Sequence, residues 1–127
     1  MIVLDTSILI EALSGAGPAA AALRRAIASG ERTVLPALVL YEWLRGPRVA
    51  QELTVQEALF PAQESLPFGP EEARTASELY REVRRPRGRE MDLAIAACAL
   101  SWHAKLWTAN KRDFEDIPRL ELWPTAS

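Results

Sequence analysis

The chain has 127 residues, about the length of one domain, and its 15 basic and 17 acidic residues leave a net charge of −2. With one histidine (His103) and one cysteine (Cys98), the sequence excludes a disulfide framework, a zinc site built from Cys and His, and a mechanism that needs two histidines. No apolar run reaches the roughly 18 residues of a membrane span. We therefore expect a soluble cytoplasmic protein that forms a single domain over residues 1–127.

Apolar runs and turn residues alternate along the chain, and their order predicts its elements. In chain order we expect a strand at Met1–Leu4, helices at Ser7–Leu13 and Pro18–Ala28, a strand at Thr33–Leu35, helices at Ala37–Arg45 and Ala50–Leu59, a strand at Ser65–Phe68, helices at Glu71–Arg84 and Met91–Trp102, and strands at Leu106–Thr108 and Glu121–Trp123. Strands that alternate with helices indicate an α/β fold. The prediction is a three-layer α/β/α arrangement around a four- to five-stranded parallel sheet.

Polar residues follow two of the expected strands at the points where the strands end. In an open parallel sheet the ligand site lies outside the carboxyl ends of the strands. The residues that this rule singles out are Asp5, Thr6 and Ser7 after the first strand, and Thr108, Asn110 and Asp113 after the fourth.

Each acid near these positions also has an ordinary structural interpretation. Asp5 precedes a helix and could be an N-cap, whose carboxylate accepts backbone N–H bonds. Asp92 could complement the dipole of the helix that it begins, and Asp113 and Asp116 could be turn residues. Glu42 is different, because apolar residues surround it on its helix and an ionised carboxylate among apolar groups is costly unless it is compensated.

A metal site is a second interpretation of four of these acids when they are considered together. They are Asp5, Glu42, Asp92 and Asp113. Two of them follow strands, and the two helical acids can cover the same edge of the sheet. Several carboxylates in one place repel each other unless a cation lies among them. Oxygen ligands favour Mg²⁺ or Mn²⁺, and such an ion suits hydrolysis of phosphodiester bonds without a histidine.

Four segments resemble the motifs of PIN-domain ribonucleases. They are residues 3–10, 41–46, 92–97 and 108–114, and their order is similar to that in VapC-type toxins of toxin–antitoxin pairs. The resemblance covers about residues 2–123 and implies a PIN-like fold and a Mg²⁺- or Mn²⁺-dependent endoribonuclease. It implies that Asp5, Glu42, Asp92 and Asp113 are the catalytic, metal-binding acids, and that Asn110 and a hydroxyl of Thr6 or Ser7 support them. Asp116, in the same loop as Asp113, is a further supporting candidate. One departure is Met91, where many relatives carry a small or polar residue, so Glu90 is an alternative to Asp92.

Five arginines occupy nine positions between residues 81 and 89, directly before Asp92. Guanidinium groups match the geometry of phosphates, although a helix C-terminus also favours arginine in solvent. The residues that we expect to contact RNA are Arg45, Arg85, Arg87, Arg89, Lys111 and Arg112. The family resemblance further implies a homodimer and a cognate antitoxin protein, with no membrane partner.

Three other functions are compatible with the same residues. The first is a catalytically silent PIN-like domain that binds RNA or serves as a scaffold, although all four acids are present. The second is a metal-dependent DNA nuclease. The third is a phosphohydrolase or phosphotransferase with Asp5 as nucleophile, and this chemistry usually needs a second acid at position 7, where the chain has Ser7.

Overall fold

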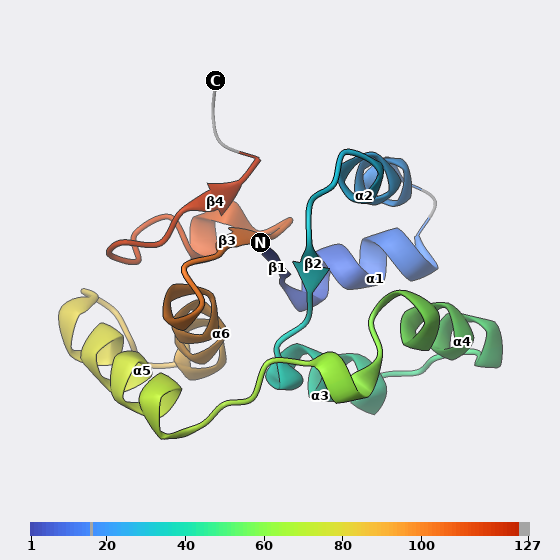
Figure 1. The fold of residues 1–127 in the computed structure, drawn as a ribbon. Helices are drawn as coiled ribbons and strands as arrows, with labels where there is room; N and C mark the ends of the chain where they lie inside the picture. Colours follow the sequence, from blue (N-terminus) through green and yellow to red (C-terminus); the bar gives the residue numbers. More distant parts are fainter. Residues whose placement is uncertain (16, 125–127) are drawn as a thin grey trace.

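A four-stranded parallel sheet forms the centre of the protein, which is described here by a computed structural model covering residues 1–15 and 17–124 (Figure 1). The strands lie in the order β2-β1-β3-β4. Their bounds are β1 Ile2–Leu4, β2 Thr33–Val34, β3 Lys105–Trp107 and β4 Leu122–Trp123. Because β1 and β3 are neighbours, with Leu4 opposite Trp107 in the register, the residues that follow the two strands emerge side by side.

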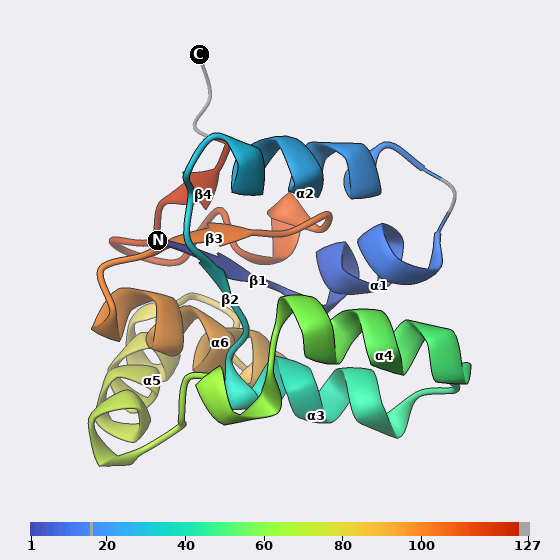
Figure 2. The same ribbon diagram turned by 45° about the vertical axis from the view of Figure 1, so that its right-hand side comes forward.

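Helices cover both faces of this sheet. Their bounds are α1 Thr6–Ser14, α2 Ala19–Ala28, α3 Ala37–Arg45, α4 Ala50–Leu59, α5 Pro70–Glu82 and α6 Glu90–Ser101. α2 lies over one face and α5 and α6 over the other, while α1 continues from the carboxyl end of β1 and packs on α3 and α4 (Figure 2). Within the described residues no single helix is long and apolar enough to cross a bilayer; α1 and α2 meet that test only together, with a 102° bend between them.

The predicted α/β fold with helices on both faces is confirmed, and the predicted strand at Ser65–Phe68 is wrong. Leu66 forms only an isolated parallel bridge with Pro36. The bridge consists of bonds from Leu66 N to Leu35 O (2.8 Å) and from Ala37 N to Leu66 O (2.7 Å). It cannot extend into a ladder, because Pro36 and Pro67 have no N–H to donate. The sheet therefore has four strands, at the lower end of the predicted range.

The α6 helix occupies the core under the sheet, as its apolar sequence predicts. Five consecutive residues, 95–99, are fully buried. Burial raises the pKa of the Cys98 thiol to about 12, so this side chain is an inert apolar group. The helix ends in a Schellman motif: His103 has a φ of 52°, and its N–H and that of Ala104 bond to Leu100 O and Ala99 O at 3.1 and 2.9 Å.

Candidate active site at the carboxyl ends of β1 and β3

Asp5 is a buried carboxylate that two hydroxyl groups hold in place. Its side chain follows β1 and is 5% exposed. Thr108 Oγ1 donates to Asp5 Oδ2 over 2.8 Å, and Ser7 Oγ donates to the same oxygen over 3.0 Å. The two hydroxyl oxygens are 3.3 Å apart. Since both bonds end on Oδ2, Asp5 Oδ1 takes no part in them and can serve another group.

The loop after β3 supports this arrangement through its backbone. Ala109 N donates to Ser7 Oγ and Asn110 N donates to Thr108 Oγ1, each over 3.0 Å. The main-chain N–H of Asp5 in turn donates to Trp107 O over 2.9 Å. Asp5 does occupy the N-cap position of α1, but its side chain makes no capping bond. The N-cap interpretation of this carboxylate is therefore wrong.

Glu42 is also oriented by a hydroxyl group from α1. Thr6 Oγ1 donates to Glu42 Oε1 over 2.6 Å, which ties α1 to α3. The other oxygen, Oε2, lies 3.5 Å from Arg45 Nη2. The guanidinium of Arg45 lies 5.2 Å from the centre of the Tyr41 ring. Glu42 is thus a half-buried acid with one oxygen fixed by Thr6 and one facing a cation.

Asp92 lies in the first turn of α6, and its pKa responds to the charges of the other three acids. Burial, followed by the negative charges of Asp5, Asp113 and Glu42, raises the pKa of Asp92 to about 6, while the Arg89 cation lowers it. The charges of all three other predicted acids therefore reach Asp92. We call Asp5, Glu42, Asp92 and Asp113 the carboxylate cluster.

Asp113 lies in η2 (Lys111–Asp113), a short 3-10 helix beyond β3. Its side chain is exposed, whereas the next residue, Phe114, is 1% exposed and anchors the segment in the core. The Arg89 guanidinium reaches this segment from α6: Nη2 donates to Asp113 O over 2.9 Å. It also forms a bidentate ion pair with Asp116, with distances of 2.6 and 2.9 Å.

The donor chemistry of the carboxylate cluster fits a hard divalent cation. Every side chain in it offers oxygen ligands, the kind that Mg²⁺ and Mn²⁺ prefer. The raised pKa of Asp92 reflects burial first and then repulsion from the other acids, and a cation would relieve that repulsion. Across residues 1–15 and 17–124, no three acidic, histidine or cysteine side chains converge closely enough to enclose an ion as they stand. An ion bound by three of these side chains would therefore require them to move closer together.

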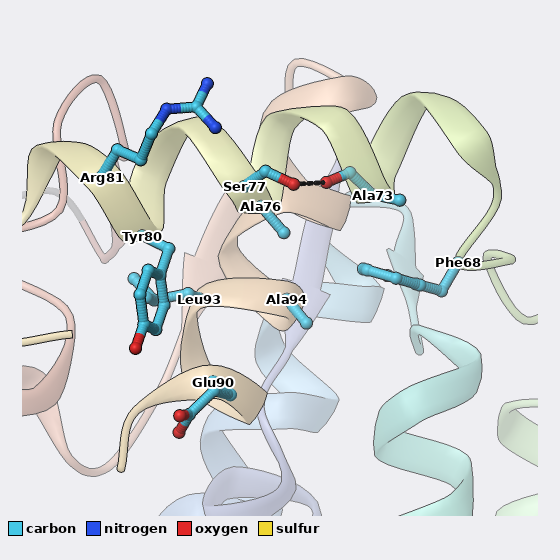
Figure 3. Close-up of a pocket in the computed structure, with 9 residues that line it drawn as sticks. All are labelled: Phe68, Ala73, Ala76, Ser77, Tyr80, Arg81, Glu90, Leu93 and Ala94. Atoms are coloured by element: carbon cyan, nitrogen blue, oxygen red, sulfur yellow. Dashed lines mark hydrogen bonds between the residues drawn. The ribbon is translucent and has the colours of Figure 1, made fainter. Parts of the chain in front are cut away.

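Glu90, the alternative to Asp92, lies away from the cluster. Its side chain lines a groove of about 480 Å³ between α5 and α6, together with Tyr80 and Leu93 (Figure 3). Two positions along a helix point about 200° apart, so Glu90 and Asp92 leave opposite sides of α6. The carboxylate at position 92, and not that at position 90, faces the other acids.

Most of the predicted basic residues lie on the surface. The side chains of Arg45, Arg85, Arg87, Lys111 and Arg112 are exposed, as is that of Asn110. Arg89 differs, because its side chain is 20% exposed and its guanidinium is bound to protein groups. Thr108 follows β3 and is one of the residues that the strand-end rule singles out, although it is not in the set that the family resemblance implies; the structure brings it into contact with Asp5. A hydroxyl directly after a strand is the sequence signal that points to it.

Comparisons with known proteins agree with this geometry. A family model described as the PIN domain matches residues 2–120. The chain is 36% identical over 123 residues to "Ribonuclease VapC19" of Mycobacterium tuberculosis, an alignment that covers 95% of this chain and 98% of the relative. A solved "Toxin-antitoxin complex from Klebsiella pneumoniae" is similar with a TM-score of 0.74 and 26% identity, covering 93% of each chain. DNA-bound VapBC from Salmonella typhimurium shares the fold, with a TM-score of 0.78, 24% identity and 95% coverage of each chain.

Proposed function

This chain belongs to the PIN domain family, and we propose that it is a metal-dependent endoribonuclease, the toxin component of a toxin–antitoxin pair. The relative from M. tuberculosis is named a ribonuclease, and the similar Klebsiella structure is a toxin–antitoxin complex. Both similarities extend over more than nine-tenths of the chain, so they bear on the chain as a whole.

One observation carries the proposal: the charges of Asp5, Asp113 and Glu42 all act on Asp92. The fold alone does not account for three acids that lie near enough to Asp92 to repel its charge. A nuclease accounts for them, because its metal ion needs oxygen ligands and its substrate is a phosphodiester.

In this proposal the carboxylate cluster holds Mg²⁺ or Mn²⁺. Such an ion, when bound, activates water and stabilises negative charge on the phosphate and on the leaving oxygen. The chain orients its ligands in advance: Ser7 and Thr108 fix Asp5, and Thr6 fixes Glu42. The single histidine, His103, lies beyond the opposite end of α6, about 16 Å along the helix axis from Asp92. Proton transfer at the site thus falls to carboxylates and water.

RNA binding and protein partners complete the proposal. Exposed basic side chains lie close in sequence to two acids of the cluster. Arg85 and Arg87 precede α6, which carries Asp92, and Lys111 and Arg112 directly precede Asp113. Since the similar solved structures include toxin–antitoxin complexes, the partner of this chain is a cognate antitoxin. The family resemblance further implies a homodimer. Its action belongs in the cytoplasm, where RNA substrates are found.

The test is cleavage of single-stranded RNA by the purified protein with Mg²⁺, with Mn²⁺ and with EDTA. We expect cleavage that either ion supports, that EDTA abolishes and that Asp5→Asn removes. Glu90→Gln is the matched control, since it neutralises a nearby acid outside the cluster. Cleavage that survives both EDTA and Asp5→Asn would refute the assigned site. Binding of RNA without cleavage would favour a silent scaffold, and preference for a DNA strand of the same sequence would favour a DNA nuclease.

A further inference from the structure

Arg89 connects the two segments that carry Asp92 and Asp113. Through its main chain it begins α6: Arg89 is the N-cap residue, and its carbonyl accepts the first helical bond from Leu93 N over 2.9 Å. Through its side chain it reaches the segment after β3, 24 residues away, where it binds Asp113 O over 2.9 Å. Asp92 is in the turn that Arg89 begins.

Asp116 fixes the direction of this guanidinium. Its two carboxylate oxygens take one bond each from Arg89 Nη1 and Nη2, at 2.9 and 2.6 Å. Such a bidentate pair fixes the plane of the guanidinium. Nη2 also donates to the Asp113 carbonyl, so the position of Asp116 determines where the Asp113 backbone is held. A fourth bond, from Nη1 to Arg85 O over 3.4 Å, ties the same group to the segment before α6.

We propose that Arg89 and Asp116 are a pair of positioning residues that hold Asp113 at a fixed place relative to Asp92. The inference rests on the proposed function, because it concerns ligands of the metal site. It assigns Arg89 a role other than contact with RNA, and it assigns Asp116 a role other than metal ligation. Asp113 needs such a support because its segment is a single turn of 3-10 helix with an exposed side chain.

Two kinds of substitution separate positioning from RNA binding. Arg89→Lys retains the positive charge but loses the planar fork. Asp116→Asn retains the shape of the partner but loses its charge, and it releases the guanidinium. If Arg89 and Asp116 position Asp113, both variants should lose Mn²⁺ affinity and kcat to a similar extent. An RNA-binding role makes Arg89→Lys raise KM without changing Mn²⁺ affinity, and it makes Asp116→Asn neutral or favourable, because more of Arg89 becomes available to phosphate.

The chain offers a matched control pair on its surface. Arg119 and Glu82 also form a bidentate ion pair, with distances of 3.1 and 3.0 Å, between α5 and the segment before β4. Arg119→Lys and Glu82→Gln make the same chemical changes at a pair that holds no cluster residue. Thermal unfolding of all four variants and the wild type establishes that each protein is folded before the comparison is made.

The first measurement is binding of Mn²⁺ by calorimetry, and the second is hydrogen exchange of the metal-free protein. Supporting side chains around metal ligands typically contribute 10–100-fold to metal affinity. We expect Arg89→Lys and Asp116→Asn each to weaken Mn²⁺ binding by about 10-fold or more. The amides of Asp113 and Phe114 should exchange faster in both variants, and the Arg119 and Glu82 controls should match the wild type.

RNA kinetics give the third measurement. We expect kcat to fall in both variants with KM changed less than about 2-fold, because the metal site and not the RNA contact is affected. A raised KM in Arg89→Lys with unchanged Mn²⁺ affinity would overturn the inference, as would wild-type exchange and affinity in Asp116→Asn. If the wild type cleaves no RNA, the proposed function fails, and Mn²⁺ affinity and hydrogen exchange still decide the roles of Arg89 and Asp116.

Discussion

The hydroxyl of Thr108 donates a 2.8 Å hydrogen bond to Asp5 Oδ2, joining residues that are 103 positions apart in the sequence. The bond exists because β1 and β3 are parallel neighbours, so that the residues following them meet at one edge of the sheet. Thr108 is 3% exposed, and it also accepts a bond from Asn110 N. One buried hydroxyl thus fixes both an acid of the cluster and the loop that leads to Asp113.

Thr108→Val tests the contribution of this hydroxyl, because valine retains the shape and removes the bonds. We expect the free energy of unfolding to fall by about 2 kcal/mol, since the variant loses a bond to a charged group and leaves Asn110 N–H without its partner. Thr54→Val is the control, because the Thr54 hydroxyl donates to Ala50 O within its own exposed helix. Urea unfolding measures both, and equal losses would contradict the assigned role of Thr108.

The raised pKa of Asp92 predicts how stability depends on pH without divalent ions. The folded-state pKa of about 6 lies above the ordinary value of about 3.9, so the folded protein binds the proton more tightly than the unfolded chain. The contribution of Asp92 is therefore fully present below about pH 4 and is lost as the pH rises through about 6. Because Asp92 is only half-buried, solvent screening keeps the loss well below the roughly 3 kcal/mol that the full shift would give.

Urea unfolding at several pH values, with EDTA present, measures this effect. Asp92→Asn stays neutral, so its stability should decline less than that of the wild type between pH 4 and 6. Added Mg²⁺ should stabilise the wild type at pH 7, because the ion binds the ionised carboxylate. Parallel pH curves for the two proteins would show that Asp92 titrates normally.

Asp92→Asn and Glu90→Gln compare two acids of one helix turn that face different sides of α6. We expect Asp92→Asn to reduce kcat by at least about 100-fold, since loss of a ligand should exceed the 10–100-fold cost of losing a supporting residue. Glu90→Gln should retain wild-type kcat, because Glu90 lines the groove between α5 and α6. Steady-state RNA cleavage checks both, and the reverse order of effects would identify Glu90 as the acid in the site.

The exposed cations beside Asp113 should bind RNA phosphates. In an Asp5→Asn background, which permits binding without cleavage, Lys111→Gln with Arg112→Gln should weaken RNA binding. The slope of log affinity against log salt should become shallower by about 0.7 for each phosphate that the variant no longer neutralises. Arg24→Gln with Arg25→Gln removes two exposed cations of α2 and should leave the slope unchanged. Equal effects of the two double variants would indicate non-specific attraction only.

Helix bounds are predictable from the sequence where turn residues such as proline and glycine mark the ends of a helix. The bounds of α3 and α4 agree with the predicted Ala37–Arg45 and Ala50–Leu59, and proline and glycine delimit the first of these helices. The predicted strand at Ser65–Phe68 is wrong because the pattern of apolar residues takes no account of the two prolines at the bridge, Pro36 and Pro67.

The sequence leads to the acids of the candidate site and to several polar residues beside them, but not to the contacts that each side chain makes. The strand-end rule leads to Asp5 and Asp113, whereas Glu42 and Asp92 depend on their unusual apolar surroundings and on family resemblance. The hydrogen-bond partners of Arg89 could not be predicted from the sequence, because a long arginine side chain can reach many groups. Its partners are Asp116 and the Asp113 carbonyl because η2 lies close to the start of α6. The choice of Thr6 as the partner of Glu42 depends in the same way on how α1 packs on α3.

The pairing of β1 with β3 has a consequence for the timing of activity during synthesis. Asp5 leaves the ribosome 103 residues before Thr108, the residue whose hydroxyl holds it, and β3 emerges just ahead of Thr108. Non-local parallel pairs form late in folding, since the intervening chain must first be ordered. A nascent chain therefore carries an incomplete site until β3 and Thr108 have emerged. The ribosome that makes this protein is not exposed to a working nuclease before that point.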